Sequence, residues 1–268
     1  MKVRSQSSST PTRRFKSFSR KQMAGRWSRA RVLRELRKVA NPKVRANMEY
    51  FGVKVPKAYG ISQPILHALA RRIGKDHALA EQLWSSGIHE ARILATLIGE
   101  PAKVTARQME RWAREFDSWD IVDAACCYLY AGASSAWLQV EAWSGRREEF
   151  VKRAAFSLAA YLSYKDTQAP DARFEGFLRV IEREAHDERN FVRKAVNWAL
   201  RNIGKRNLRL NRSAIRAAER IRKHESRSAR WIAADALREL RSDAVQQRLR
   251  ERRREMWHQW QRRSRQQK

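Results

Sequence analysis

The residues whose types could do chemistry are concentrated between Phe116 and Leu129, in the stretch FDSWDIVDAACCYL. Trp119 and Asp123 lie four residues apart, so on a helix they share one face, one turn above the other. A carboxylate can stabilise positive charge that develops during a reaction, and an indole face attracts cations. An exposed tryptophan beside an exposed carboxylate is unusual in a strongly basic chain, which makes this pair a candidate site.

A helix must position these two side chains. Ser118 is a suitable N-cap residue, and Asp120 suits the positive end of a helix. A buried stripe is predicted by apolar residues at three- and four-residue steps, namely Ile121, Val122, Ala125, Cys126 and Leu129. Trp119 and Asp123 fall outside this stripe. An equally supported interpretation is structural, with Trp119 packed at a helix boundary and Asp123 paired with an arginine.

Composition predicts an all-α protein. The chain has 268 residues, of which 43% are apolar, and it contains ten glycines and six prolines. Strong helix formers dominate and β-branched runs are absent. This length allows one elongated domain or two ordinary ones.

The formal net charge of +30 indicates a polyanionic partner, and nucleic acid is the first candidate. An anionic membrane surface is the competing interpretation, but basic residues are spread along the whole chain instead of one amphipathic helix. No apolar run approaches the ~20 residues of a membrane span, and the N-terminus lacks the apolar core of a secretory signal. We therefore expect an intracellular protein, cytoplasmic and nucleoid-associated, without membrane contact.

Metal and cofactor sites are not expected. The two cysteines, Cys126 and Cys127, are adjacent, and no CxxC or Cys/His ligand spacing exists. The six histidines are scattered and show no HExxH pattern. We interpret the cysteines as small buried residues.

Three segments are expected along the chain. Residues 1–24 are rich in Ser, Arg and Lys, and are predicted to form a disordered basic arm, with an organelle transit peptide as the alternative. Residues 25–248 are predicted to form the helical domain. Residues 249–268 are predicted to form a basic C-terminal helix or tail whose charge could also follow phosphates.

A helical repeat is indicated by four similar segments, each with an arginine in its first turn followed by small Ala positions. They are Ile88–Ile98, Glu149–Leu162, Asn190–Ile203 and Ser228–Leu240. Arg193 and Arg230 are 37 residues apart, close to the ~40 residues of a HEAT-type unit. Such helices bury their stripes by stacking, which predicts a HEAT-like solenoid with a concave basic cleft. An irregular helical bundle is the alternative.

Cations are expected around a second tryptophan. Trp198 lies outside the buried stripe of its segment, and Lys194 and Arg201 lie on its face, which suits contacts with sugar and phosphate. Lys152 and Arg153 begin a turn predicted to point to the same side of the solenoid. For Arg153, an ion pair between repeats is an alternative to phosphate contact.

The chain from about Tyr50 to Leu240 resembles the DNA alkylation repair family of HEAT-like-repeat DNA glycosylases. The resemblance is carried by FGVKVPKAYGIS, DHALAEQLWSSGIHEARILATLI, SWDIVD, FVKRAAFSLAAYL and NFVRKAVNWALRNIGKRN. The ordered series SWDxxD, KRAA and KAxxW is its most specific part. The segment from Ala131 to Arg147 is not aligned with the family.

The resemblance implies an α-solenoid that cradles duplex DNA and hydrolyses the N-glycosidic bond of cationic alkylpurines, without fully extruding the base. The implied cleft residues are Trp119, Asp123, Arg153 and Trp198. Asp123 would stabilise an oxocarbenium-like sugar and orient water, both indoles would contact the deoxyribose, and Arg153 would hold a phosphate and keep Asp123 ionised.

Three functions remain open from the sequence. The first is a monofunctional glycosylase acting on alkylated purines of the 3-methyladenine and 7-methylguanine type, working as a monomer on double-stranded DNA. The second is a non-catalytic DNA-binding solenoid. The third is a protein-interaction scaffold, for which an acidic protein would compete as well as DNA.

Overall fold

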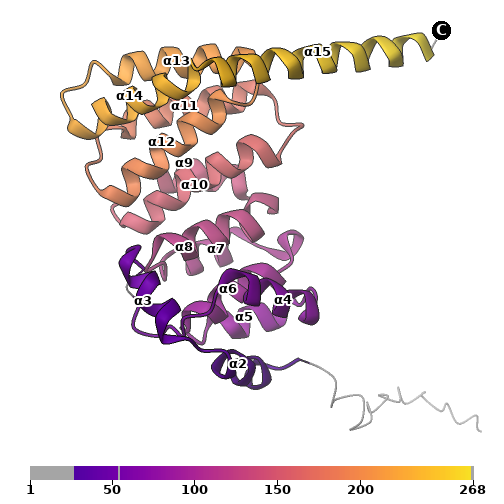
Figure 1. Cartoon of the computed structure of the whole chain (residues 1–268), viewed down its shortest axis with the longest axis vertical. Coiled ribbons are helices and arrows are strands. Elements are labelled where there is room, and N and C mark those ends of the chain that lie inside the picture. The colour runs from indigo at the N-terminus through magenta and orange to yellow at the C-terminus, as the bar shows by residue number, and fades with distance from the viewer. Residues whose placement is uncertain (1–26, 54, 267–268) are drawn as a thin grey trace, which may run out of the picture.

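The protein is a stack of helices. The computed structural model describes residues 27–53 and 55–266, and within these ranges the secondary structure is helical, without strands. Figure 1 shows the helices following one another along the long axis, from α2 at one end to α13, α14 and α15 at the other. The prediction of an all-α helical solenoid is confirmed. The predicted arm, residues 1–24, lies outside the described residues.

The helices are α2 (Arg29–Lys38), α3 (Pro42–Tyr50), α4 (Gln63–Ile73), α5 (His77–Trp84), α6 (His89–Ile98), η1 (Pro101–Lys103), α7 (Ala106–Ala113), α8 (Trp119–Ala124), η2 (Ala125–Leu129), η3 (Tyr130–Gly132), α9 (Ala136–Ser144), α10 (Glu149–Lys165), α11 (Asp171–Glu184), α12 (Asn190–Gly204), α13 (Leu208–Ile221), α14 (Arg227–Leu240) and α15 (Asp243–Gln266).

The four similar segments form α6, α10, α12 and α14 at nearly the predicted bounds. Small residues allow these helices to pack closely. Ala154, Ala155 and Ala159 of α10 are fully buried. A Cβ atom placed on Gly204 of α12 would come within 2.7 Å of the Leu240 side chain of α14, so this approach requires glycine. The repeat therefore buries its stripes by stacking, as the pattern predicts.

The central helix differs from the predicted regular one. The stripe of apolar residues is fully buried as expected, but α8 gives way at Ala125 to the π-helical turn η2 and then to the 3-10 turn η3. Within η2 the Cys126 thiol contacts the carbonyl oxygen of Ala154 on α10 at 3.6 Å. π-Turns inside α-helices are rare and occur frequently at functional sites.

The loop between α3 and α4 is fastened by a buried carboxylate. Glu90 of α6 accepts hydrogen bonds from the backbone N–H groups of Tyr59, Gly60 and Ile61. Gly60 has φ +75°, and a Cβ atom there would lie 2.3 Å from the backbone oxygen of Asn41. The hydrogen bonds of Glu90 and the close backbone approach at Gly60 together fix the position of α3 beside α8.

The last helix begins before residue 249, the first residue of the predicted C-terminal segment. α15 begins at Asp243, and its Val245 and Leu249 are buried against the end of the stack. The basic tail predicted from residue 249 is therefore the continuation of a helix that starts earlier. Figure 1 shows α15 projecting away from the other helices.

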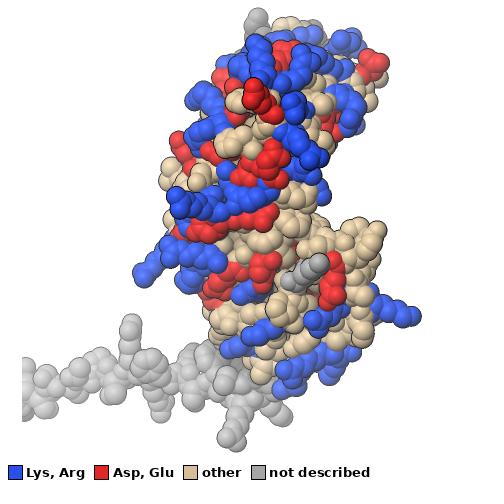
Figure 2. Space-filling view, turned by 90° about the vertical axis from the view of Figure 1, so that its left-hand side faces the viewer, with Lys and Arg blue, Asp and Glu red and all other residues tan. Residues whose placement is uncertain are grey.

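Basic side chains are unevenly spread over the surface. Figure 2 shows the side of the molecule on which α3 lies, where Lys and Arg occur from one end to the other and are densest at the end that carries α13 and α14. Carboxylates lie between them in the middle of this face, so the positive charge there is not continuous.

Candidate nucleic-acid cleft and active site

A cavity of about 440 Å³ opens where α8, α10 and α12 meet the end of α3. It is lined by Phe51, Trp119, Asp123, Arg153, Tyr161, Phe191, Lys194 and Trp198. Five of the seven residues predicted for the site line this cavity. They come from three helices far apart in sequence, so the repeat is what brings them together.

Asp123 is held through both of its oxygens. Arg153 Nη2 donates to Oδ2 at 2.8 Å, and the Ser157 hydroxyl donates to Oδ1 at 2.9 Å. The side chain of Asp123 remains 20% exposed, so a ligand in the cavity can reach it. Burial raises the pKa of Asp123 above its ordinary value, although Arg153 and Ser157 favour the charged form. The carboxylate is thus oriented but poorly solvated.

The side chain of Arg153 lies in the wall of the cavity and contacts several neighbours. Its Nη1 donates to the Phe191 carbonyl oxygen at 2.9 Å, and its guanidinium carbon lies 5.9 Å from the Trp119 ring centroid. The side chain is only 8% exposed. Arg153 therefore makes the ion pair between repeats that was the alternative to phosphate contact, and this ion pair orients Asp123. Its contact with a phosphate stays a prediction.

The indoles line the cavity and are fixed by neighbours. Trp119 is half-buried, packs on a small apolar cluster, and donates from Nε1 to the Phe51 carbonyl oxygen at 3.1 Å. Trp198 meets Tyr161 edge to face, with ring centroids 4.9 Å apart. Trp119 is thus both the boundary packing residue of the structural interpretation and part of the cavity.

The two carboxylates of the SWDIVD motif have different environments. Asp120 Oδ2 lies 2.8 Å from Nε2 of the buried His89. Burial opposes ionisation of Asp120, but hydrogen bonds from His89 and Ser118 outweigh it, and the pKa of Asp120 is lowered. Asp120 therefore ties α8 to α6, while Asp123 faces the cavity with a raised pKa. Such divergence between neighbouring carboxylates is typical of sites with distinct roles.

Lys152 is not a surface residue, which corrects the expectation that it contacts DNA. Its side chain is buried, and Nζ pairs with Glu184 at 2.7 Å and Asp187 at 2.9 Å. Neighbouring helical residues point about 100° apart, so Lys152 faces α11 while Arg153 faces the cavity. Burial opposes ionisation of Asp187, but hydrogen bonds from Arg189 and Lys152 hold its pKa well below the ordinary range.

Lys194 and Arg201 have separate positions. Lys194 is exposed at the cavity and has no ion-pair partner among the described residues. Arg201 does not line the cavity and instead pairs with Glu239 and Asp235 of α14. Of the two, Lys194 is the one whose ammonium group, within the described ranges, is unpaired at the cavity, and its contact with a phosphate stays a prediction.

Sequence reasoning missed four residues at this site. Ser157 and Tyr161 lie four and eight residues after Arg153, so helical spacing alone could have placed them on its face. Phe51 and Phe191 stand at helix ends, and no periodic pattern marks them.

Two further observations concern the part of the chain that the structure covers. No group of three or more His, Cys, Asp or Glu side chains is placed to hold a metal ion in residues 27–53 and 55–266. Within the same ranges, no helix has the length and apolar character needed to cross a bilayer.

Comparison with known proteins agrees with this architecture. A family model described as "DNA alkylation repair enzyme" matches residues 32–240. A solved structure described as "a new family of proteins related to the HEAT-like repeat DNA glycosylases with affinity for branched DNA structures" is similar, with a TM-score of 0.66 and 17% sequence identity. The match covers 79% of this chain and 95% of that one. No curated protein sequence matches the chain. Because the family model spans most of the sequence, the chain belongs to the DNA alkylation repair enzyme family.

Proposed function

We propose that the protein is a monofunctional DNA glycosylase that hydrolyses the N-glycosidic bond of cationic alkylated purines in duplex DNA. The observation that carries this proposal is the placement of Asp123. Its two oxygens are held by Arg153 and Ser157 in a cavity walled by Trp119 and Trp198.

The residues suit a reaction that needs no strong general acid. A purine alkylated at N3 or N7 already carries positive charge and leaves as a neutral base. Cleavage of its glycosidic bond builds positive charge on the deoxyribose. A carboxylate about 4 Å from that charge stabilises it by ~4 kcal/mol at an effective dielectric constant of ~20. Asp123 is the carboxylate of the cavity, and it would also orient the attacking water.

The aromatic walls would contact the sugar. Trp119 and Trp198 present ring surface to the cavity, where cation–π attraction favours the same developing charge. Tyr161 supports Trp198, and the Phe51 carbonyl fixes Trp119. Because these groups would grip a deoxyribose rather than enclose a purine, the proposal includes cleavage without full extrusion of the base.

The DNA itself would be held mainly by charge. A net charge of +30 attracts a duplex over a long range, and Lys194 stands exposed at the cavity for a phosphate near the lesion. In this proposal the protein works as a monomer.

The test is release of free base. Methylated duplex DNA is incubated with the protein, and 3-methyladenine and 7-methylguanine are measured by liquid chromatography. Release that is lost in Asp123→Asn and Trp119→Ala supports the proposal.

A second candidate is a DNA-binding protein without catalysis. It is favoured by the similar structure whose description gives affinity for branched DNA. In that case, binding would be tight and salt-sensitive, and no base would be released. A comparison of junction and linear duplexes in the same binding assay would then show whether branching is preferred.

A further inference from the structure

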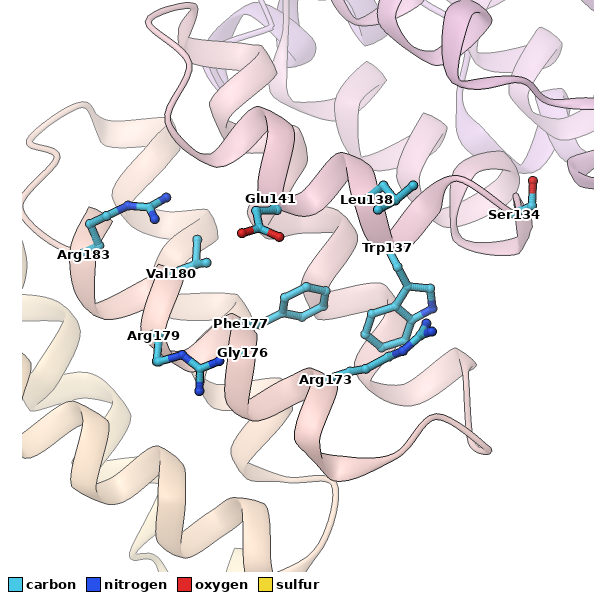
Figure 3. A pocket seen from close by; sticks show the side chains of 10 residues that line it. All are labelled: Ser134, Trp137, Leu138, Glu141, Arg173, Gly176, Phe177, Arg179, Val180 and Arg183. Carbon is cyan, nitrogen blue, oxygen red and sulfur yellow. The ribbon is translucent and has the colours of Figure 1, made fainter.

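A second and larger hollow, of about 810 Å³, lies between α9 and α11. We call it the α9–α11 groove; its lining residues are those labelled in Figure 3. It shares no residue with the cavity around Asp123. The proposed glycosylase reaction therefore does not explain it.

The floor of the groove is apolar. Figure 3 shows Trp137 of α9 beside Phe177 of α11, and their rings stack with centroids 5.1 Å apart. Leu138 next to them is 73% exposed. Binding pockets are typically lined by apolar and aromatic side chains with a few charged groups at fixed positions.

The rim carries cations that no carboxylate neutralises. Among the described residues, Arg173 and Arg179 have no ion-pair partner. Helix α11 does contain acidic residues. Its glutamates pair with other cations: Glu175 with Arg209, Glu182 with Arg220, and Glu184 with Lys152 and with Arg183 at the edge of the groove.

Gly176 leaves the middle of the groove open. It stands inside the 14-residue helix α11, where glycine is the least favourable residue after proline. A Cβ atom placed there would meet only Arg179 Nη2, at 3.8 Å, so no packing contact of the chain requires glycine. An interior helical glycine without an internal reason is expected where another backbone approaches closely.

We propose that the α9–α11 groove binds an acidic segment of a partner protein, with an apolar side chain seated between Leu138 and Phe177. Acidic residues of the segment would pair with Arg173 and Arg179, and its backbone would pass over Gly176. Helix–helix grooves of this form commonly receive peptide segments.

Other occupants fit less well. Residues 1–26 contain no acidic residue, so the N-terminal segment of this chain would be repelled by the rim. A nucleic-acid base would need a free aromatic face. Trp137 has Phe177 stacked on it, and the Arg173 guanidinium lies 4.9 Å from its ring centroid.

The experiment selects peptides against the full-length protein. A phage-displayed library of random peptides of about 12 residues is enriched on the protein and counter-selected on Gly176→Leu, which fills the groove without changing charge. The matched control is Gly145→Leu, because Gly145 also has open space around its Cβ position but does not line the groove. The proposal expects acidic peptides with a Leu, Phe or Trp anchor.

A selected peptide is then labelled with fluorescein and titrated by fluorescence anisotropy. Gly176→Leu and the double variant Arg173→Gln with Arg179→Gln should each weaken binding at least ~10-fold. Gly145→Leu and the charge-matched double variant Arg212→Gln with Arg216→Gln should bind as the parent does. Binding of duplex DNA by Gly176→Leu should be unchanged.

Three results would overturn the proposal. The first is failure to enrich any peptide over the Gly176→Leu background. The second is enrichment of peptides without acidic residues. The third is a labelled single-stranded oligonucleotide that loses affinity for Gly176→Leu, because nucleic acid would then be the occupant.

Discussion

Replacing Asp123 with asparagine removes one negative charge from the cavity and keeps the volume of the side chain. The amide oxygen can accept the hydrogen bond from Arg153, and the amide N–H group can donate to the Ser157 hydroxyl, so the geometry of both contacts survives. The change therefore isolates the charge of Asp123 from its packing.

The expected loss follows from that charge. An interaction of ~4 kcal/mol with the sugar cation corresponds to about 1,000-fold in rate, since each 1.4 kcal/mol is a factor of ten. Affinity for DNA should change little, because one buried carboxylate contributes little to a field set by a net charge of +30. The neutral amide relieves the desolvation cost of the buried carboxylate, but it leaves the buried Arg153 without its carboxylate partner, which lowers stability, so the folding of the variant is checked directly.

The assay is single-turnover release of 7-methylguanine from methylated duplex DNA, with circular dichroism to confirm folding. Asp117→Asn is the matched control, because it removes the same charge from a residue that is 44% exposed and pairs with Arg92 outside the cavity. Excision by Asp123→Asn at the parental rate would remove Asp123 from the reaction and refute the reasoning above.

Three further predictions concern pH and stability. Because burial raises the pKa of Asp123 and excision needs its carboxylate, activity should fall on acidification at a higher pH than the ~4 of an exposed aspartate; a rate profile between about pH 4 and 8 checks this. Lys152→Met should lower the free energy of unfolding by about 1–3 kcal/mol, because Glu184 and Asp187 lose their shared buried cation and keep only Arg183 and Arg189, and unchanged stability in urea would contradict this. The folded-state pKa values of Glu184 and Asp187 are lowered. Their contribution to stability is therefore complete above the unfolded pKa of ~4 and is lost as the pH falls. The free energies of unfolding of Lys152→Met and the parent should thus be closest at acidic pH. Gly60→Ala should cost at least ~2 kcal/mol through its positive φ and the nearby backbone oxygen, and an unchanged melting temperature would show that the loop yields instead.

Much of the fold could be predicted because helical periodicity is a local property. The stripe from Ile121 to Leu129 is buried, and α10 and α12 begin at the predicted residues Glu149 and Asn190. The same periodicity placed Trp119 and Asp123 off the stripe and on one face. The π-turn η2 could not be predicted, because it depends on how the chain after Ala124 meets α10.

The tertiary structure decided what each cation does. Lys152 and Arg153 are adjacent and alike in sequence, yet one is buried against α11 and the other holds Asp123. Their difference depends on which helix packs on each side of α10, and spacing along one helix contains no information about that neighbour.

By itself, the sequence determined that the chain is all-α, that its helices repeat, and that a tryptophan and a carboxylate share a helix face outside the apolar stripe. Only the tertiary structure brought Phe51, Tyr161 and Phe191 around Asp123, and only it opened the α9–α11 groove. Side-chain direction around one helix follows from local backbone geometry, whereas the meeting of residues from distant helices follows from how the repeats stack.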